Sequence, residues 1–84
     1  MGIRILYFAS LRERIGQSAE ELTLPDGIDT LGRLRAHIAA RGAHWDAFAE
    51  GKSLRAAVNQ RMAQAETSVD DGDEVAFFPP VTGG

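Results

Sequence analysis

The sequence predicts an α+β domain in which a mixed sheet of four to five strands packs on one main helix and an extended tail follows. Segments rich in β-branched and aromatic residues, typical of strands, occur near both ends of the chain. One segment with helical spacing of its apolar residues lies between them. The prolines Pro79 and Pro80 end the last of these strands, because proline donates no hydrogen bond to a sheet.

The first strand is expected at residues 3–8. Successive side chains of a strand point to opposite faces, which sorts this segment into two sets. One set is Ile3, Ile5 and Tyr7, and the other is Arg4, Leu6 and Phe8. Residues 10–17 are expected to form a short helical turn or loop. Residues 20–24 alternate in polarity and predict a second, half-buried strand, which the turn at residues 25–27 closes.

The main helix is expected to begin after Thr30, a good N-cap residue, and to run to about Arg41. Its apolar stripe consists of Leu31, Leu34 and Ile38. Gly42 stands where a glycine often ends a helix. Gly32, in the first turn, lowers helix propensity by up to about 1 kcal/mol relative to alanine and has no explanation in the sequence.

Three more strands are predicted at residues 54–58, 61–63 and 74–78, while Trp45 and Phe48 are expected to fill the core from a short turn. A right-handed crossover through the helix would place the last strand beside the first and parallel to it. This order of elements is that of the ubiquitin-like, or β-grasp, fold. The predicted organisation is one domain at 1–78 and a flexible Gly-Gly tail at 79–84.

The composition of the chain argues against several classes of function. The chain has 84 residues, which is one domain, and a formal net charge of −3 without a basic cluster, so we expect no nucleic acid as a partner. It has no cysteine, which excludes disulfides and thiolate metal sites. No apolar run approaches the roughly 20 residues that span a bilayer, and no secretory signal is evident. We therefore expect a cytoplasmic protein without a membrane partner.

No set of side chains predicts catalysis or a metal site. His37 and His44 are seven residues apart, which is no metal-ligand spacing. The acidic turn at residues 70–73 lacks the remainder of a twelve-residue calcium loop. Phosphate-binding loops and nucleophile elbows are also missing from the sequence. We therefore expect no metal and no enzymatic activity from this chain on its own.

The C-terminal Gly83-Gly84 pair is the remaining candidate. A frayed end is one interpretation, since termini are usually mobile. The other is functional: six residues from Pro79 reach about 20 Å beyond the domain, and a tail end without side chains can enter a narrow active site. The carboxylate of Gly84 is ionised at neutral pH and is a poor electrophile. Adenylation would activate it, and a sulfur nucleophile could then convert it to a thiocarboxylate.

Three segments resemble the molybdopterin synthase small subunit family. They are DGDEVAFFPPVTGG at residues 71–84, LYFASLRE at 6–13 and AAVNQ at 56–60. The likeness spans essentially the whole chain and is most specific in the last fourteen residues.

The resemblance implies a sulfur carrier whose Gly84 cycles between the glycyl-adenylate and 1-thioglycine. An E1-like adenylyltransferase would supply the activation with Mg-ATP, and no cofactor would be bound permanently. The large synthase subunit would take the tail into its active site, in a heterotetramer with two copies of each subunit. Sulfur would pass to cyclic pyranopterin monophosphate in molybdenum cofactor biosynthesis. This chain would then be the non-catalytic, sulfur-donating subunit.

The sheet face away from the helix is the expected partner surface, because soluble monomers rarely leave an apolar patch uncovered. The resemblance supports Phe8, Met62 and Phe78 as contacts for both partners. It adds four tail residues as contacts, namely Pro79, Pro80, Val81 and Thr82. The alternative for Phe8 or Phe78 is packing against a loop of the same domain.

Three other functions share these features. A sulfur carrier of the thiazole pathway would have the same fold and chemistry with a different acceptor. A ubiquitin-like protein modifier would join Gly84 to lysines. A non-catalytic interaction module would have a tail without function.

Overall fold

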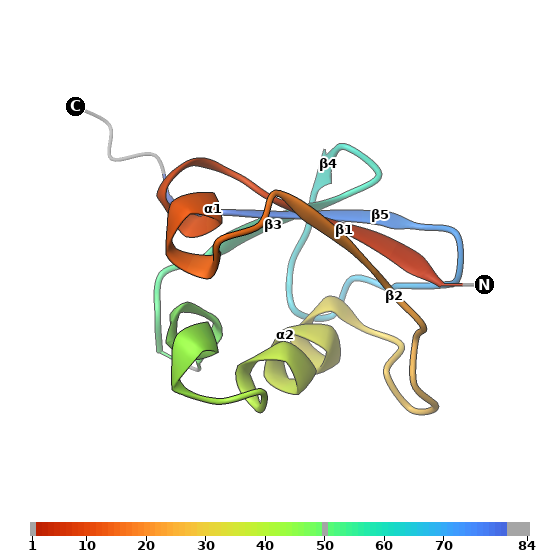
Figure 1. The fold of residues 1–84 in the computed structure, drawn as a ribbon. Helices are drawn as coiled ribbons and strands as arrows, with labels where there is room; N and C mark the ends of the chain where they lie inside the picture. Colours follow the sequence, from red (N-terminus) through yellow and green to blue (C-terminus); the bar gives the residue numbers. More distant parts are fainter. Residues whose placement is uncertain (1, 50, 81–84) are drawn as a thin grey trace.

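The computed structural model describes residues 2–49 and 51–80 of the chain. The elements, in chain order, are β1 (Ile3–Tyr7), α1 (Ala9–Ile15), β2 (Ala19–Leu22), α2 (Leu31–Ala39), the 3-10 helix η1 (Ala43–Phe48), β3 (Arg55–Val58), β4 (Arg61–Met62) and β5 (Glu74–Phe78). Figure 1 shows the sheet as one layer with α2 and η1 covering one of its faces, while α1 lies at one end of it.

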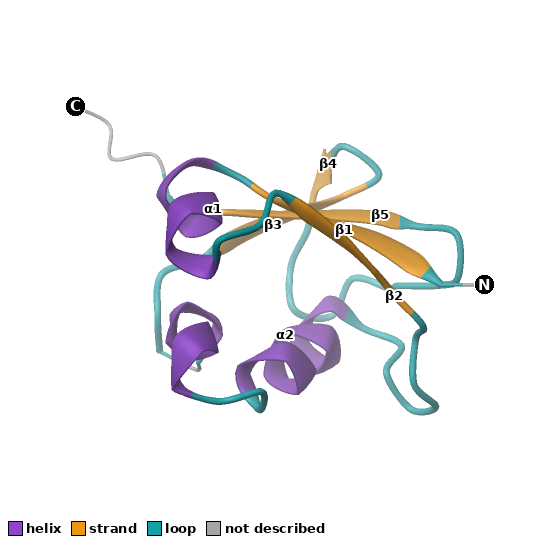
Figure 2. Cartoon of the chain, in the orientation of Figure 1, coloured by secondary structure: helices purple, strands orange, loops and turns teal. Residues whose placement is uncertain are grey.

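The five strands form a single mixed sheet in the order β2-β1-β5-β3-β4. Strand β5 runs parallel to β1, with Ile5 opposite Val75 and Tyr7 opposite Phe77. The other pairings, β1 with β2, β3 with β4 and β3 with β5, are antiparallel. The predicted parallel placement of the last strand beside the first is confirmed, and the two-layer arrangement in Figure 2 is the β-grasp fold.

The core lies between the sheet and the helices. The strands contribute the set predicted for β1, together with alternate residues of β3 and β5; these are Ile3, Ile5, Tyr7, Ala56, Val58, Val75 and Phe77. The stripe of α2 is buried as predicted, and Phe48 fills the core from η1 with Trp45 partly buried beside it. Apolar burial of this kind is the main stabilising term for a domain of this size.

The main helix begins as predicted but ends earlier. The Thr30 side chain accepts a hydrogen bond from the backbone N–H of Arg33 at 3.2 Å. The helix stops at Ala39 with Ala40 as its cap, so the expectation that it runs to about Arg41 is wrong by two residues. Gly42, with φ of 128°, precedes η1 and does not end α2.

The structure explains Gly32. Its backbone N–H donates to the carbonyl oxygen of Ala65 at 2.8 Å. A Cβ at position 32 would lie 3.1 Å from that oxygen and 3.2 Å from the Cβ of Ala65. Glycine therefore permits a close approach between the first turn of α2 and the segment that follows β4.

The remaining boundaries differ from the predictions by one or two residues, apart from β5, which begins and ends as predicted. Residues 9–15 form a helix that ends at Gly16 with φ of 86°. The turn between β3 and β4 holds Asn59 and Gln60 at φ of 51° and 68°. Asparagine is tolerated in this region, and the Asn59 side chain also accepts a hydrogen bond from the backbone of Glu74 at 3.0 Å.

Candidate functional site

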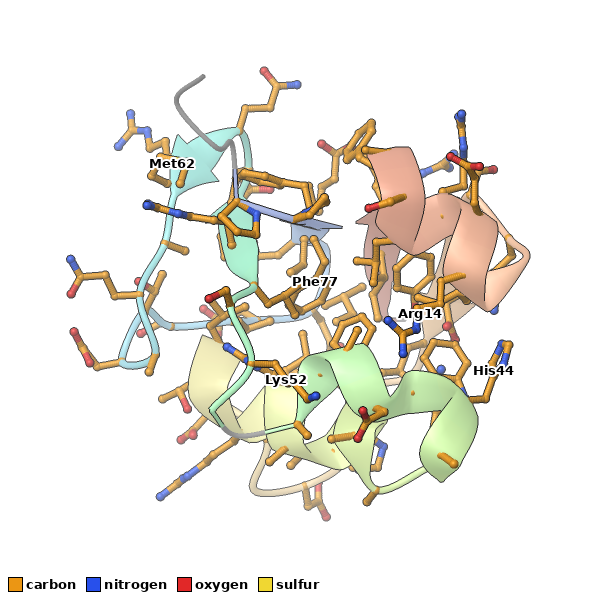
Figure 3. The ribbon with its side chains drawn as sticks, turned by 90° about the vertical axis from the view of Figure 1, so that its left-hand side faces the viewer. Arg14, His44, Lys52, Met62 and Phe77 are labelled. Atoms are coloured by element: carbon orange, nitrogen blue, oxygen red, sulfur yellow. The ribbon has the colours of Figure 1, made fainter. Side chains whose placement is uncertain are left out.

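The candidate site includes β5, and the two faces of this strand have different environments. Phe77 is 1% exposed and meets the ring of Phe48 edge-on, with centroids 4.9 Å apart. Figure 3 shows Phe77 directed toward the layer of helices. Phe78 is half-buried and lies on the opposite face of the strand. Phe77 therefore belongs to the core, and Phe78 lies on the outer face, where the sequence analysis expected it.

A row of apolar side chains crosses the outer face of the sheet. Leu6 of β1 lies opposite Ala76 of β5, Ala76 lies opposite Ala57 of β3, and Ala57 lies opposite Met62 of β4. The two central residues are alanines and the two outer ones are longer. Across the outer face, two small alanine side chains are therefore flanked by the longer side chains of Leu6 and Met62.

Two aromatic residues extend this row toward the end of the sheet. The backbone N–H of Phe8 donates to the carbonyl oxygen of Phe77 at 3.1 Å, which places Phe8 beside the end of β5. Phe8 is 44% exposed and Met62 is 62% exposed, and these are the large exposed hydrophobic residues of the described chain. We call the set Leu6, Phe8, Ala57, Met62, Ala76 and Phe78 the open face.

The other end of the same sheet face is charged. Arg4 of β1 lies between Glu21 of β2 and Glu74 of β5 in the register. The apolar part is therefore confined to the end at which the chain leaves β5. A partner that covers the open face would also lie next to the start of the tail.

The tail begins at this end with Pro79 and Pro80, both of which are half-buried. Val81, Thr82, Gly83 and Gly84, which the sequence analysis assigns to partner contact and to the reaction, lie outside the described residues. The structure thus brings Phe8, Phe78 and the two prolines to one end of the sheet. Met62 lies across the open face from them.

Charged side chains elsewhere have structural contacts. In the acidic turn, Asp73 Oδ2 accepts a hydrogen bond from the backbone N–H of Asp70 at 2.8 Å. His44 Nε2 lies 2.9 Å from the carbonyl oxygen of Ile15. Within residues 2–49 and 51–80, no group of three or more His, Cys, Asp or Glu side chains is placed to hold a metal ion. No helix in that part of the chain is long and apolar enough to cross a membrane.

Sequence reasoning missed a polar network beneath the sheet. The Tyr7 hydroxyl donates to Glu20 Oε1 at 2.5 Å, and Arg41 donates to both oxygens of Glu20, at 2.8 and 3.0 Å. The guanidinium carbon of Arg41 also lies 4.6 Å from the centre of the Trp45 ring. The network ties β1, which contributes Leu6 to the open face, and β2 to the segment after α2.

The environment of this network shifts the pKa values of Glu20 and Tyr7, among others. The hydrogen bonds from Arg41 lower the pKa of the Glu20 carboxyl below its ordinary value, and burial opposes this effect. Burial raises the pKa of Tyr7 well above its ordinary value, and the neighbouring Glu20 carboxylate adds to this effect. Tyr7 is therefore a neutral hydrogen-bond donor, and Glu20 is a carboxylate, at neutral pH.

Comparison with known proteins gives a family and several relatives with similar sequences. The model of a family described as the ThiS family matches residues 5–84. The chain is 45% identical over 82 residues to the molybdopterin synthase sulfur carrier subunit of Escherichia coli, covering 98% of this chain and 99% of that one. It is 38% identical over 86 residues to the protein of that name from Chlamydomonas reinhardtii, covering 100% of both.

Solved structures share the fold. A putative molybdopterin converting factor, subunit 1, from Pyrococcus furiosus is 30% identical, with a TM-score of 0.76 and coverage of 96% of this chain and 99% of that one. A chain from the complex of subunits 1 and 2 of molybdopterin-converting factor from Helicobacter pylori is 22% identical, with a TM-score of 0.66 and coverage of 100% of both. The second likeness bears on the fold alone.

Proposed function

This chain belongs to the ThiS family and has molybdopterin synthase sulfur carrier subunits as homologues, and from this premise we propose that it is the sulfur carrier subunit of a molybdopterin synthase. The observation that carries the proposal is the likeness to carrier subunits over nearly the full length of both chains. The family match also extends through Gly84.

The geometry supports the same function. The open face and the start of the tail lie at one end of the sheet, so a single partner can cover the apolar surface and receive the tail together. Burying the apolar area of the face would stabilise the complex by roughly 25 cal/mol per Å². The tail would meanwhile present the carboxylate of Gly84 to the partner's active site.

The proposed chemistry takes place at Gly84. The carboxylate oxygen attacks the α-phosphate of Mg-ATP on the adenylating partner, and pyrophosphate leaves. A sulfur nucleophile then attacks the acyl carbon of the glycyl-adenylate, and AMP leaves with one former carboxylate oxygen. The product is the thiocarboxylate of Gly84. Its sulfur forms a bond to carbon of cyclic pyranopterin monophosphate, and water then cleaves the acyl–sulfur bond and restores the Gly84 carboxylate. Because this series of reactions consumes ATP, we propose that the protein acts in the cytoplasm.

Two partners use the same surface in turn. Phe8, Met62 and Phe78 would contact the E1-like adenylyltransferase during activation and the large synthase subunit during transfer, with Pro79 to Thr82 leading the tail into each. The exposed thioether of Met62 suits a surface that adapts to two partners. The catalytic side chains would belong to the large subunit, in an assembly with two copies of each chain.

Reconstitution tests the proposal. The purified chain is incubated with an adenylating enzyme, Mg-ATP and a sulfur donor, and then with the large subunit and cyclic pyranopterin monophosphate. We expect a mass increase equal to the replacement of one oxygen by sulfur, followed by formation of a dithiolene product. A chain lacking Gly84 is the matched control and should gain no sulfur.

The other functions give different outcomes in this experiment. A thiazole-pathway carrier would gain sulfur but form no dithiolene with the large subunit. A protein modifier would form ladders of conjugates on lysines. An interaction module would gain no sulfur at all, and that result would contradict the proposal outright.

A further inference from the structure

A cation borders the open face at the end of the sheet where the tail begins. Arg55, the first residue of β3, lies opposite Phe78 of β5 in the antiparallel register. Residues that lie directly opposite each other present their side chains on the same face of a sheet. Arg55 is exposed, whereas the next residue, Ala56, is buried on the inner face. The guanidinium of Arg55 therefore belongs to the outer face, next to one of the two aromatic residues of the open face.

The neighbours of Arg55 on this face carry no charge. Phe78 lies opposite it, and Ala57 is the next residue of β3 that points to the same side. Within residues 2–49 and 51–80, the guanidinium of Arg55 makes no hydrogen bond or ion pair. In the free chain its charge is therefore stabilised by water.

The cation at the opposite end of this face has a different setting. Arg4 lies between Glu21 and Glu74 in the register, so two carboxylates flank one guanidinium. Opposite charges on neighbouring strands compensate each other in part. The outer face is therefore polarised, with an excess of negative charge at the end remote from the tail and the uncompensated charge of Arg55 at the end near it.

A partner that covers Phe78 also removes water from Arg55. Side chains directly opposite each other in a sheet have Cβ atoms only about 5 Å apart. Loss of water from a charged group is strongly unfavourable unless an opposite charge and new hydrogen bonds replace it. The planar guanidinium matches a carboxylate through two parallel hydrogen bonds. The chemistry that suits Arg55 is thus an aspartate or glutamate of the partner.

We propose that Arg55 determines specificity at the open face, and that the large synthase subunit binds it through a carboxylate beside the site that receives Phe78. The inference rests on the proposed function for the identity of the partner. A protein with an apolar site but no carboxylate at this position would leave Arg55 without water or a counter-charge, and would be rejected. The polarity of the face also favours one docking orientation, with the tail end toward the acidic side of the partner.

Titration calorimetry of the chain against the large subunit tests this role of Arg55. Arg55→Gln should raise the Kd roughly tenfold or more, because the partner's carboxylate would lose a charged hydrogen bond and stay desolvated. Arg55→Lys should bind with intermediate affinity, since it keeps the charge and loses the planar fork. Thermal unfolding should be the same for all three chains, because Arg55 is exposed.

The matched control is Arg33→Gln. Arg33 lies on α2, in the layer that covers the other face of the sheet, and its ion pair with Asp29 is exposed. This variant removes the same charge at little cost to folding and should bind like the wild type. About 0.5 M sodium chloride should weaken binding of the wild type more than binding of Arg55→Gln, because salt screens the added ion pair.

Cross-linking tests for the carboxylate itself. The Arg55→Lys variant, in complex with the large subunit, is treated with a carbodiimide that joins amines to neighbouring carboxylates as amides. Peptide mapping should find an amide between position 55 and an aspartate or glutamate of the large subunit. A cross-link that maps to Lys52 and not to position 55 would place the partner's carboxylate elsewhere and overturn the inference.

Two results of the titration would also overturn it. One is an unchanged Kd for Arg55→Gln, and the other is an equal loss of affinity in Arg33→Gln, which would assign the effect to net charge. In both cases the wild type still binds the large subunit, so the proposed function stands. A wild-type chain that fails to bind the large subunit would overturn the proposed function and this inference together.

Discussion

Phe77 and Phe78 are neighbours on β5, yet Phe77 packs edge-on against Phe48 in the core while Phe78 lies across the sheet from Arg55 on the outer face. A strand reverses the direction of its side chains at every residue, so two identical residues in sequence take opposite roles. One residue holds the sheet to the helices and the other is available to a partner.

Substitution separates these roles. Phe77→Ala should destabilise the domain by about 3–5 kcal/mol, because it removes a buried ring and leaves a cavity. Phe78→Arg should change the free energy of unfolding little but should weaken binding to the large subunit by about 2 kcal/mol or more. Thermal unfolding and titration calorimetry measure the two effects. The reverse pattern would show that Phe78, not Phe77, stabilises the core.

Local alternation and turn residues were sufficient to predict much of the fold. Strand β5 is bounded by the acidic turn on one side and by Pro79 on the other, so its ends and its two faces follow from neighbouring residues. The same alternation separated Phe8 from the core set of its strand, and the family resemblance supported Phe8, Met62 and Phe78 as contacts. Ala57 was not, because an alanine carries little signal until the register places it between Ala76 and Met62.

Features that depend on distant residues could not be predicted. Arg41 is a good helix former, and nothing nearby in sequence ends α2 before it. Its guanidinium instead binds Glu20, which is 21 residues away in the chain. The same holds for Gly32, whose close approach to the carbonyl oxygen of Ala65 depends on a residue 33 positions later in the chain.

Changes at the tail should affect activity without affecting folding. Deleting Gly84, or adding an alanine after it, should abolish sulfur loading because the reacting carboxylate is lost or displaced. Gly83→Val should also block loading, since a β-branched side chain beside the reacting carbon restricts the backbone and adds bulk. Intact mass measures loading, and thermal unfolding should stay at the wild-type value. Full loading of the alanine-extended chain would contradict the assignment of Gly84.

Replacing Gly32 tests the close approach to Ala65. Gly32→Ala should destabilise the domain by roughly 1 kcal/mol even though alanine raises helix propensity by a similar amount. The added Cβ would meet a backbone carbonyl at 3.1 Å, and that carbonyl already accepts the hydrogen bond from residue 32. Urea unfolding measures the change. A gain in stability would mean that the segment at Ala65 moves away easily.

Glu20→Gln tests the polar network and predicts a particular pH dependence. At neutral pH the variant should be about 1–3 kcal/mol less stable than the wild type, because hydrogen bonds between charged groups are replaced by weaker ones. The folded-state pKa of Glu20 is lowered below its unfolded value. A lowered carboxyl pKa contributes stability above the unfolded pKa, and this contribution is lost as the pH falls through the folded-state value.

The stability difference between wild type and Glu20→Gln should therefore be constant from neutral pH down to the ordinary glutamate range, and should shrink below it. Tyr7→Phe is the matched control, because it removes the hydroxyl that donates to Glu20 and leaves the Arg41 pair in place. Its stability difference from the wild type should shrink much less on acidification. Chemical unfolding at a series of pH values measures both. A difference for Glu20→Gln that persists unchanged in acid would show that Arg41 does not hold the ionised carboxylate in the folded protein.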